Sequence, residues 1–385
     1  MAVMDPAIRL QYRRALSRAQ ETVRKGVCAG SDSTTASHWR LWVSHCKPLG
    51  IDPLLTNMQD PVQPLQVFAE LYRDGTLAPS RDQVRARTVE GAVRSIGQTI
   101  ASVGAPDPRY TVNGKIDFRL RRMWAAWGRE DPPPHRVKPI PVSIVRHVAS
   151  LADAANTPRM HAIADMIILA FYFLLRPGEY TASSSSTTPF ALEDVQLFVG
   201  TRRLRLFEDD VDLFRSVTFC TLVFTTQKNG VRGEVIGLGR SGHIAVCPVN
   251  SLVRRVLHLR AHNAPPRTPL AVYYTNGNTT GSVTAANITT ALRSSARLLG
   301  AMVGFSPGDV SARSLRAGGA MSLMCAGVDS DVIQLMGRWC SDEMMKYLHI
   351  QGAPVMRNFA KRMYNAGSFS LIPNPQSPEL TVPLH

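Results

Sequence analysis

Residues 310–350 gather fixed positive charges around a single tyrosine. Arg313 and Arg316 lie three residues apart, so a helix would place both guanidinium groups on one face. Arg338 follows a glycine after an apolar run, and Tyr347 comes nine residues later. Arginine forks bind phosphodiester oxygens in a two-pronged way, and a tyrosine hydroxyl can attack phosphorus as a nucleophile. The pattern predicts metal-free phosphoryl transfer on nucleic acid.

Two further cations stand upstream. Arg176 directly follows an apolar, helix-like run and opens the segment Arg-Pro-Gly-Glu, which breaks the helix. Such an arginine is either a C-terminal helix cap or a buried functional cation, and the downstream arginines favour the second interpretation. Lys228 lies in Gln-Lys-Asn-Gly, a segment that predicts a hairpin turn. A lysine in a turn is ordinarily only a solvated residue.

In order and local context these residues resemble the tyrosine recombinase (phage integrase) family of DNA breaking and rejoining enzymes. The segments SLRAGGA and GRWCSD are most similar to the crypton-type recombinases of eukaryotic mobile elements. The resemblance extends over roughly residues 140–365. It implies a catalytic set with two supporting residues: Arg176, Lys228, Arg313, Arg316, Arg338 and Tyr347, with support from Glu179 and Trp339.

The resemblance also implies a role for each part. Arg176 and Arg316 would bind the phosphate, and Tyr347 would attack it to form a 3′-phosphotyrosine. Lys228 would protonate the departing 5′ oxygen as general acid, and Glu179 would orient the first arginine through an ion pair. The covalent link conserves the diester bond energy, so the expected reaction needs no metal, nucleotide or other cofactor.

Two positions depart from the family pattern. Arg313 stands where the family usually has histidine, and Arg338 stands where histidine or tryptophan is usual, with Trp339 one residue further. Arginine stays charged at neutral pH and cannot accept the tyrosine proton. A catalytically impaired DNA-binding protein that retains the recombinase fold is therefore the alternative function. A type IB topoisomerase fits less well, because the predicted amino-terminal helical domain and the residues of the motifs SLRAGGA and GRWCSD favour recombination.

Composition and charge agree with a nucleic-acid partner. The chain has 385 residues, a net charge of +15 and 44% hydrophobic residues, as expected of a globular protein that binds a polyanion. The six cysteines form no Cys-x-x-Cys pair, so neither a zinc site nor a disulfide framework is predicted. The acidic run at residues 208–212 is not interpreted as a magnesium site, because no second carboxylate set or phosphate-binding loop accompanies it.

No signal peptide or membrane-spanning run is evident, since the longest apolar run, residues 166–175, is too short. We expect an intracellular, DNA-associated protein, nuclear if the source is eukaryotic. The expected partners are double-stranded DNA and further copies of the chain, with the resemblance implying a tetramer on two sites. No membrane or small-molecule partner is expected.

The predicted fold is mainly α with a small antiparallel β-sheet. An amino-terminal helical core-binding domain would precede an α+β catalytic domain of the tyrosine recombinase type. The predicted segments are a basic arm (1–30), the helical DNA core-binding domain (31–128), a proline-rich linker (129–141), the catalytic domain (142–366) and a tail (367–385). Strands are predicted at 195–199, 217–225 and 234–238, and an amphipathic core-facing helix at 158–175.

Basic residues of the first domain and the linker could lie along DNA phosphates. Such contacts position a protein without reading sequence. The candidates are Arg85, Arg87, Arg94, Arg119, Arg121, Arg122, Arg136 and Lys138. Tryptophans 39, 42, 124 and 127 are interpreted as core residues rather than base-stacking groups.

Overall fold

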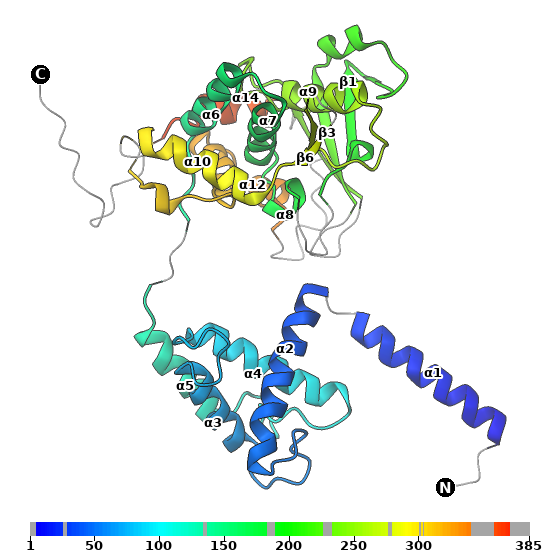
Figure 1. Cartoon of the computed structure of the whole chain (residues 1–385), viewed down its shortest axis with the longest axis vertical. Coiled ribbons are helices and arrows are strands. Elements are labelled where there is room, and N and C mark those ends of the chain that lie inside the picture. The colour runs from blue at the N-terminus through cyan, green and yellow to red at the C-terminus, as the bar shows by residue number, and fades with distance from the viewer. Residues whose placement is uncertain are drawn as a thin grey trace, which may run out of the picture. The chain divides into compact units, whose positions relative to one another are not determined.

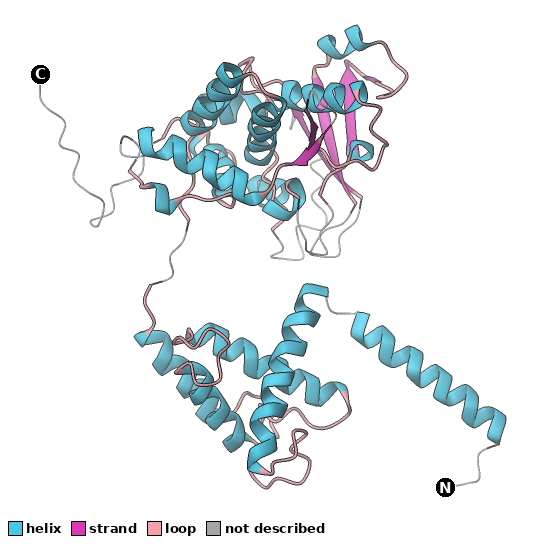
Figure 2. Cartoon of the chain, in the orientation of Figure 1, coloured by secondary structure: helices cyan, strands magenta, loops and turns pink. Residues whose placement is uncertain are grey.

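The computed structural model describes residues 5–25, 29–133, 137–182, 189–225, 233–275, 279–299, 302, 304–339 and 358–369. The chain divides into two compact units, residues 1–135 and residues 136–385 (Figure 1). The division falls inside the segment predicted as a linker. The chain is mainly helical with a small antiparallel sheet, as the sequence predicts, and Figure 2 shows that the sheet belongs to the second unit.

The first unit is built mainly of helices. Its helices are α1 (Pro6–Lys25), α2 (Ala29–Cys46), α3 (Val62–Arg73), α4 (Ala86–Ser102) and α5 (Phe118–Glu130), with the short turn η1 (Lys47–Leu49). The core forms around Trp42, whose ring meets that of Phe68 edge to face at 5.5 Å. Trp127 also belongs to this core and Trp39 and Trp124 pack against it, so the prediction that the tryptophans are core residues is confirmed.

The second unit combines helices with two antiparallel sheets. Its helices are α6 (Val142–Ala155), α7 (Pro158–Tyr172), α8 (Pro177–Tyr180), α9 (Pro248–Ala261), α10 (Ala285–Leu299), α11 (Ser314–Cys325), α12 (Ser330–Gly337) and α14 (Phe359–Ala366), with the short turns η2 (Leu192–Asp194), η3 (Val211–Ser216) and η5 (Pro307–Asp309). Its strands are β1 (Val195–Val199), β2 (Arg202–Arg203), β3 (Phe219–Phe224), β4 (Glu234–Gly239), β5 (Val272–Tyr274) and β6 (Thr280–Ser282).

Strand pairing places the predicted hairpin at the end of the larger sheet. The strand order is β2-β1-β3-β4, and β5 pairs with β6 separately. Phe219 pairs with Gly239 at one end of the β3–β4 ladder, and Phe224 pairs with Glu234 at the other. The chain therefore leaves β3 and enters β4 at the same end of the sheet. Lys228, predicted to lie in that turn, falls outside the described residues.

Helix α7 is central in the second unit. Every residue from Ala162 to Tyr172 is buried, because α6, α9, α11 and β5 all pack against the helix. The prediction of an amphipathic helix was therefore wrong in that respect: apolar residues recur at helical spacing, but alanines and Asp165 occupy the remaining positions and are also enclosed. Asp165 is accommodated by an ion pair with Arg254 of α9. The helix ends at Tyr172, and Leu174 then takes a left-handed conformation with φ 52°.

Helix α11, which carries Arg316, packs unusually closely on its neighbours through two glycines. A Cβ atom on Gly318 would overlap the carbonyl oxygen of Ile140, and one on Gly319 would overlap the carbonyl oxygen of Phe171. Only glycine permits backbones to approach at this distance. Gly319 therefore sets the distance between α11 and α7, Gly318 sets the distance between α11 and Ile140, and together they fix the position of Arg316.

Gly319→Ala should accordingly destabilise the second unit by about 1–3 kcal/mol, because the added methyl group forces α11 away from α7. Gly91→Ala is the matched control, since a Cβ on this helical glycine of α4 would meet nothing within 4 Å. The control should stabilise the first unit by roughly 0.5–1 kcal/mol. Urea unfolding followed by circular dichroism measures both effects, and a wild-type midpoint for Gly319→Ala would contradict the packing argument.

Candidate functional site

The first residue of the candidate site is Arg176, which lies between α7 and α8. Pro177 occupies the first position of α8, where its missing N–H is not needed. The Glu179 carboxylate accepts a hydrogen bond from the Arg176 backbone N–H at 2.7 Å and one from its Nη1 at 3.0 Å. The predicted ion pair is thereby confirmed. The Arg176 side chain is 27% exposed, so a ligand can reach it.

Arg316 lies in the first turn of α11 and points toward the end of α7. Its Nη1 donates to the carbonyl oxygen of Leu174 at 3.0 Å, and its Nη2 donates to the carbonyl oxygen of Gly337. The indole ring of Trp339 lies over the guanidinium group, with Cζ 4.4 Å from the ring centroid. Such cation–π stacking favours the charged form and fixes the plane of the fork.

Arg338 joins the other two arginines. It follows α12 in a left-handed conformation with φ 56°, which costs a non-glycine residue roughly 1–2 kcal/mol. This conformation turns its side chain inward, where only 2% is exposed. Its Nη2 donates to Glu179 Oε2 at 3.0 Å, and the phenyl ring of Phe224 lies over Cζ at 3.8 Å. The backbone oxygen of Arg338 in turn accepts a hydrogen bond from Arg176 at 3.4 Å.

The cluster of Arg176, Arg316 and Arg338 carries excess positive charge. Burial, followed by the charges of the two other arginines, lowers the pKa of Arg316 to about 9. Burial also lowers the pKa of Arg338 to about 10, although Glu179 and Glu234 oppose the shift. Arg316 and Arg338 remain protonated at neutral pH, because both pKa values lie above 7. Three cations against these two carboxylates leave a charge of +1 in a partly enclosed site, which favours an anionic ligand.

The remaining predicted catalytic residues are placed as follows. Arg313 is exposed at the start of α11, where its backbone N–H donates to Ser311 Oγ at 3.3 Å. Trp339 is 36% exposed beside Arg316. Tyr347, like Lys228, lies outside the described residues. The described structure thus brings together Arg176, Arg316 and Arg338 with the supporting residues Glu179 and Trp339.

Phe224 is a member of the site that sequence reasoning missed. It was predicted only as a strand residue, yet its ring covers Arg338 and is almost fully buried. The position at the end of β3, just before the predicted hairpin, was visible in the sequence. Its contact with a residue more than a hundred positions away was not.

The candidate DNA-contacting residues fall into two groups. Arg85, Arg87, Arg121 and Arg122 are exposed, and Arg94 pairs with Glu90 on the surface of α4. By contrast, Arg119 is held by Asp60 and Asp117, and Lys138 donates to the carbonyl oxygen of Gly304 at 3.0 Å and pairs with Asp309. Arg136 lies outside the described residues.

Other kinds of site receive little support from the described residues. They contain no group of three or more His, Cys, Asp or Glu side chains that could hold a metal ion. Within the acidic run, Asp209 instead pairs with Arg202 at 3.0 Å and accepts the backbone N–H of Arg205. None of the described helices has the length and apolar character needed to cross a membrane.

No model of a known protein family matches the chain, and no curated protein has a significantly similar sequence.

Proposed function

We propose that the chain is a DNA breaking and rejoining enzyme of the tyrosine recombinase type. The observation that carries the proposal is the convergence of Arg176, Arg316 and Arg338, which come from three separate parts of the sequence. Arg176 and Arg338 share the Glu179 carboxylate, and the site as a whole carries excess positive charge. A phosphodiester carries one negative charge, so its size and charge suit this cluster.

Arg316 and Arg176 are the proposed phosphate ligands. A guanidinium group has five N–H donors, and Arg316 uses only two of them on the carbonyl oxygens of Leu174 and Gly337. The remaining donors can bind the non-bridging oxygens and stabilise the charge that develops there during transfer. Both acceptors of Arg316 are backbone carbonyl oxygens, whose positions are fixed by the fold. The guanidinium group is therefore held in place before substrate binds.

Arg338 has a different role in the proposal. Its Nη1 donates to the carbonyl oxygens of Phe173 and Met336, and its Nη2 donates to the carbonyl oxygen of Leu174 and to Glu179. These bonds use all four of its Nη hydrogens. We therefore regard Arg338 as a positioning residue that holds Glu179 and the end of α7 rather than as a phosphate ligand.

Tyr347 and Lys228 complete the proposed reaction, on the strength of the sequence alone. The Tyr347 hydroxyl loses its proton to water, and its oxygen attacks phosphorus to form a phosphotyrosine bond while the bond to the 5′ oxygen breaks. The lysine ammonium supplies the proton that this oxygen takes. Attack by a 5′ hydroxyl then reverses the step, so the proton and the diester bond are both restored.

Trapping the covalent intermediate tests the proposal. The protein is mixed with nicked duplexes taken from the DNA that flanks its own gene, denatured, and examined for attached DNA. We expect an adduct that is lost in Tyr347→Phe and kept in Tyr110→Phe, a matched control at an exposed tyrosine of the first unit. An adduct that survives Tyr347→Phe would exclude this tyrosine as the nucleophile.

A non-catalytic DNA-binding protein is the second candidate. The exposed Arg313 favours it, because this position carries no group able to accept the tyrosine proton. This candidate predicts tight, salt-sensitive DNA binding with no adduct on any flanking duplex.

DNA binding should depend on the exposed arginines of α5 and not on Arg119. Arg121→Ala should lower the slope of log affinity against log salt concentration by about 0.9, as expected for one lost phosphate contact. Arg119→Ala should leave the slope unchanged, because Asp60 and Asp117 already occupy its guanidinium group. Binding titrations of the full chain at several salt concentrations measure the slopes. Equal reductions in both variants would contradict the assignment.

A further inference from the structure

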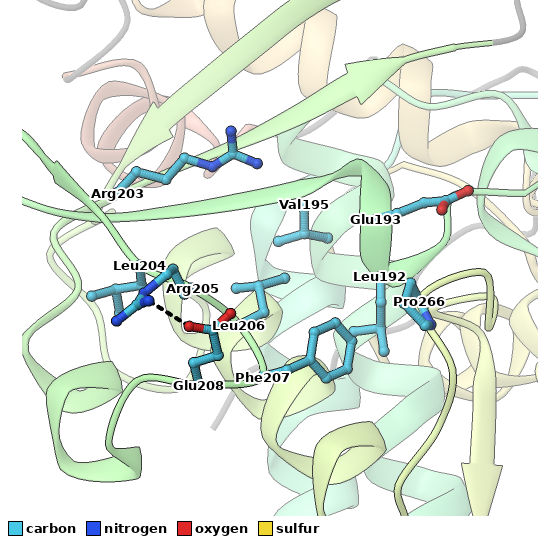
Figure 3. Close-up of a pocket in the computed structure, with 10 residues that line it drawn as sticks. All are labelled: Leu192, Glu193, Val195, Arg203, Leu204, Arg205, Leu206, Phe207, Glu208 and Pro266. Atoms are coloured by element: carbon cyan, nitrogen blue, oxygen red, sulfur yellow. Dashed lines mark ion pairs between the residues drawn. The ribbon is translucent and has the colours of Figure 1, made fainter.

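A hollow in the second unit lies apart from the arginine cluster. It has a volume of about 490 Å³ and is formed by η2, β1, β2 with the segment after it, and Pro266. Its floor is apolar, with Leu192, Val195 and Leu204 buried. Figure 3 shows the ring of Phe207 beside Leu192, and Arg203 and Glu193 on opposite sides of Val195. The lining thus combines an apolar base with charged edges, as protein-binding surfaces do.

The segment that borders the hollow is firmly held. Asp209 accepts hydrogen bonds from Arg202 and from the backbone N–H of Arg205. From α9, Arg260 donates to the carbonyl oxygens of Leu206 and Asp209 and lies over the ring of Phe214. This anchoring nevertheless leaves Phe207 45% exposed, with Val211 47% exposed on the same segment. An anchored loop that holds apolar side chains in water beside an apolar hollow indicates a binding surface.

Charge distinguishes between the classes of partner. The hollow is lined by two arginines, Arg203 and Arg205, and two glutamates, Glu193 and Glu208, so its net charge is zero. On a chain of net charge +15, such a neutral surface does not attract DNA. It is, however, a surface on which two copies of the chain can meet without repulsion. No acidic side chain among the described residues forms an ion pair with Arg203, whereas Glu208 is already paired with Arg205.

We propose that two copies of the chain associate through this hollow in the absence of DNA. In a two-fold symmetric contact each surface meets its own copy, so Phe207 of each copy enters the hollow of the other. Arg203 of one copy then faces Glu193 of the partner, whose present ion pair with the exposed Arg267 is long, at 3.8 Å. The proposal goes beyond the proposed reaction, since association by this face requires neither Tyr347 nor DNA.

Sedimentation velocity of the full chain, without DNA and over a range of concentrations, tests the proposal. We expect a monomer–dimer equilibrium in the wild type. Phe207→Asp should raise the dissociation constant roughly ten-fold or more, because it places a charge at the buried centre of the contact. Phe118→Asp is the matched control, since this phenylalanine of α5 is also exposed, and it should leave the equilibrium unchanged.

Charge exchange makes the test specific to the proposed pairing. Arg203→Glu and Glu193→Arg should each raise the dissociation constant roughly five-fold, because each places like charges opposite one another. The double variant should return to within about two-fold of the wild type, since the pair is restored with its signs exchanged. Circular dichroism checks that each variant is folded.

Three outcomes would overturn the proposal. One is a wild type that remains monomeric at all accessible concentrations. Another is a dimer that Phe207→Asp does not weaken, or that the double charge exchange does not restore. The third is a monomer whose Phe207→Asp variant binds duplex DNA ten-fold more weakly, which would assign the hollow to nucleic acid instead.

Discussion

Arg316→Ala is expected to slow covalent adduct formation by at least about 10³-fold, the effect usual for an arginine that stabilises a phosphoryl-transfer transition state. Arg316 lies where the carbonyl oxygens of Leu174 and Gly337 and the ring of Trp339 all fix its guanidinium group. A fork fixed in this way needs no reorganisation when charge develops on the phosphate. Its loss cannot be replaced by a mobile side chain nearby.

Single-turnover kinetics with saturating nicked duplex separate this effect from DNA binding. Arg297→Ala is the matched control, because Arg297 is an exposed arginine of α10 in the same unit, and it should form adduct at the wild-type rate. Arg316→Lys should fall between the two, since lysine keeps the charge but cannot hold both carbonyl oxygens with one planar fork. If Arg316→Ala forms adduct as fast as the control, the cluster is not the phosphate site.

The local parts of this site could be predicted from the sequence. The segment Arg-Pro-Gly-Glu after a long apolar run predicts that the helix ends there. In the structure Arg176 precedes α8, Pro177 is the first residue of α8, and Glu179 lies three residues after the arginine. The strand at 195–199 was predicted with the bounds that β1 has. Such features are determined by residues that are close together in the sequence, so they can be predicted from the sequence alone.

The features that were missed depend on distant contacts. Strand β2 consists of two exposed arginines, and only pairing with β1 through the turn at Gly200 makes it a strand. The inward direction of Arg338 follows from its left-handed backbone, which no arginine favours by itself. Sequence spacing therefore identified the arginines of the cluster, but it could not separate the partly exposed Arg176 and Arg316, proposed as phosphate ligands, from the buried Arg338.

Glu179→Gln tests that separation and should destabilise the second unit by roughly 3 kcal/mol. Glu179 forms ion pairs with both Arg176 and Arg338, and the side chains of Glu179 and Arg338 are only 12% and 2% exposed. Removing one partner of a buried pair leaves the other charge uncompensated, which is strongly unfavourable. Glutamine keeps the size of the side chain but replaces one acceptor oxygen with an NH2 donor, so the loss reports the charge and that acceptor rather than the packing.

Thermal unfolding should show this loss as a decrease of about 6–12 °C in Tm for a unit of this size. Asp212→Asn is the matched control, because Asp212 and its partner Arg215 are 76% and 82% exposed and their pair should contribute little. Inorganic sulfate should stabilise Glu179→Gln more than the wild type, since an anion in the cluster replaces the missing negative charge. Equal stabilisation of both proteins by sulfate would mean that the anion binds elsewhere, and the arginine cluster would then be structural rather than a phosphate site.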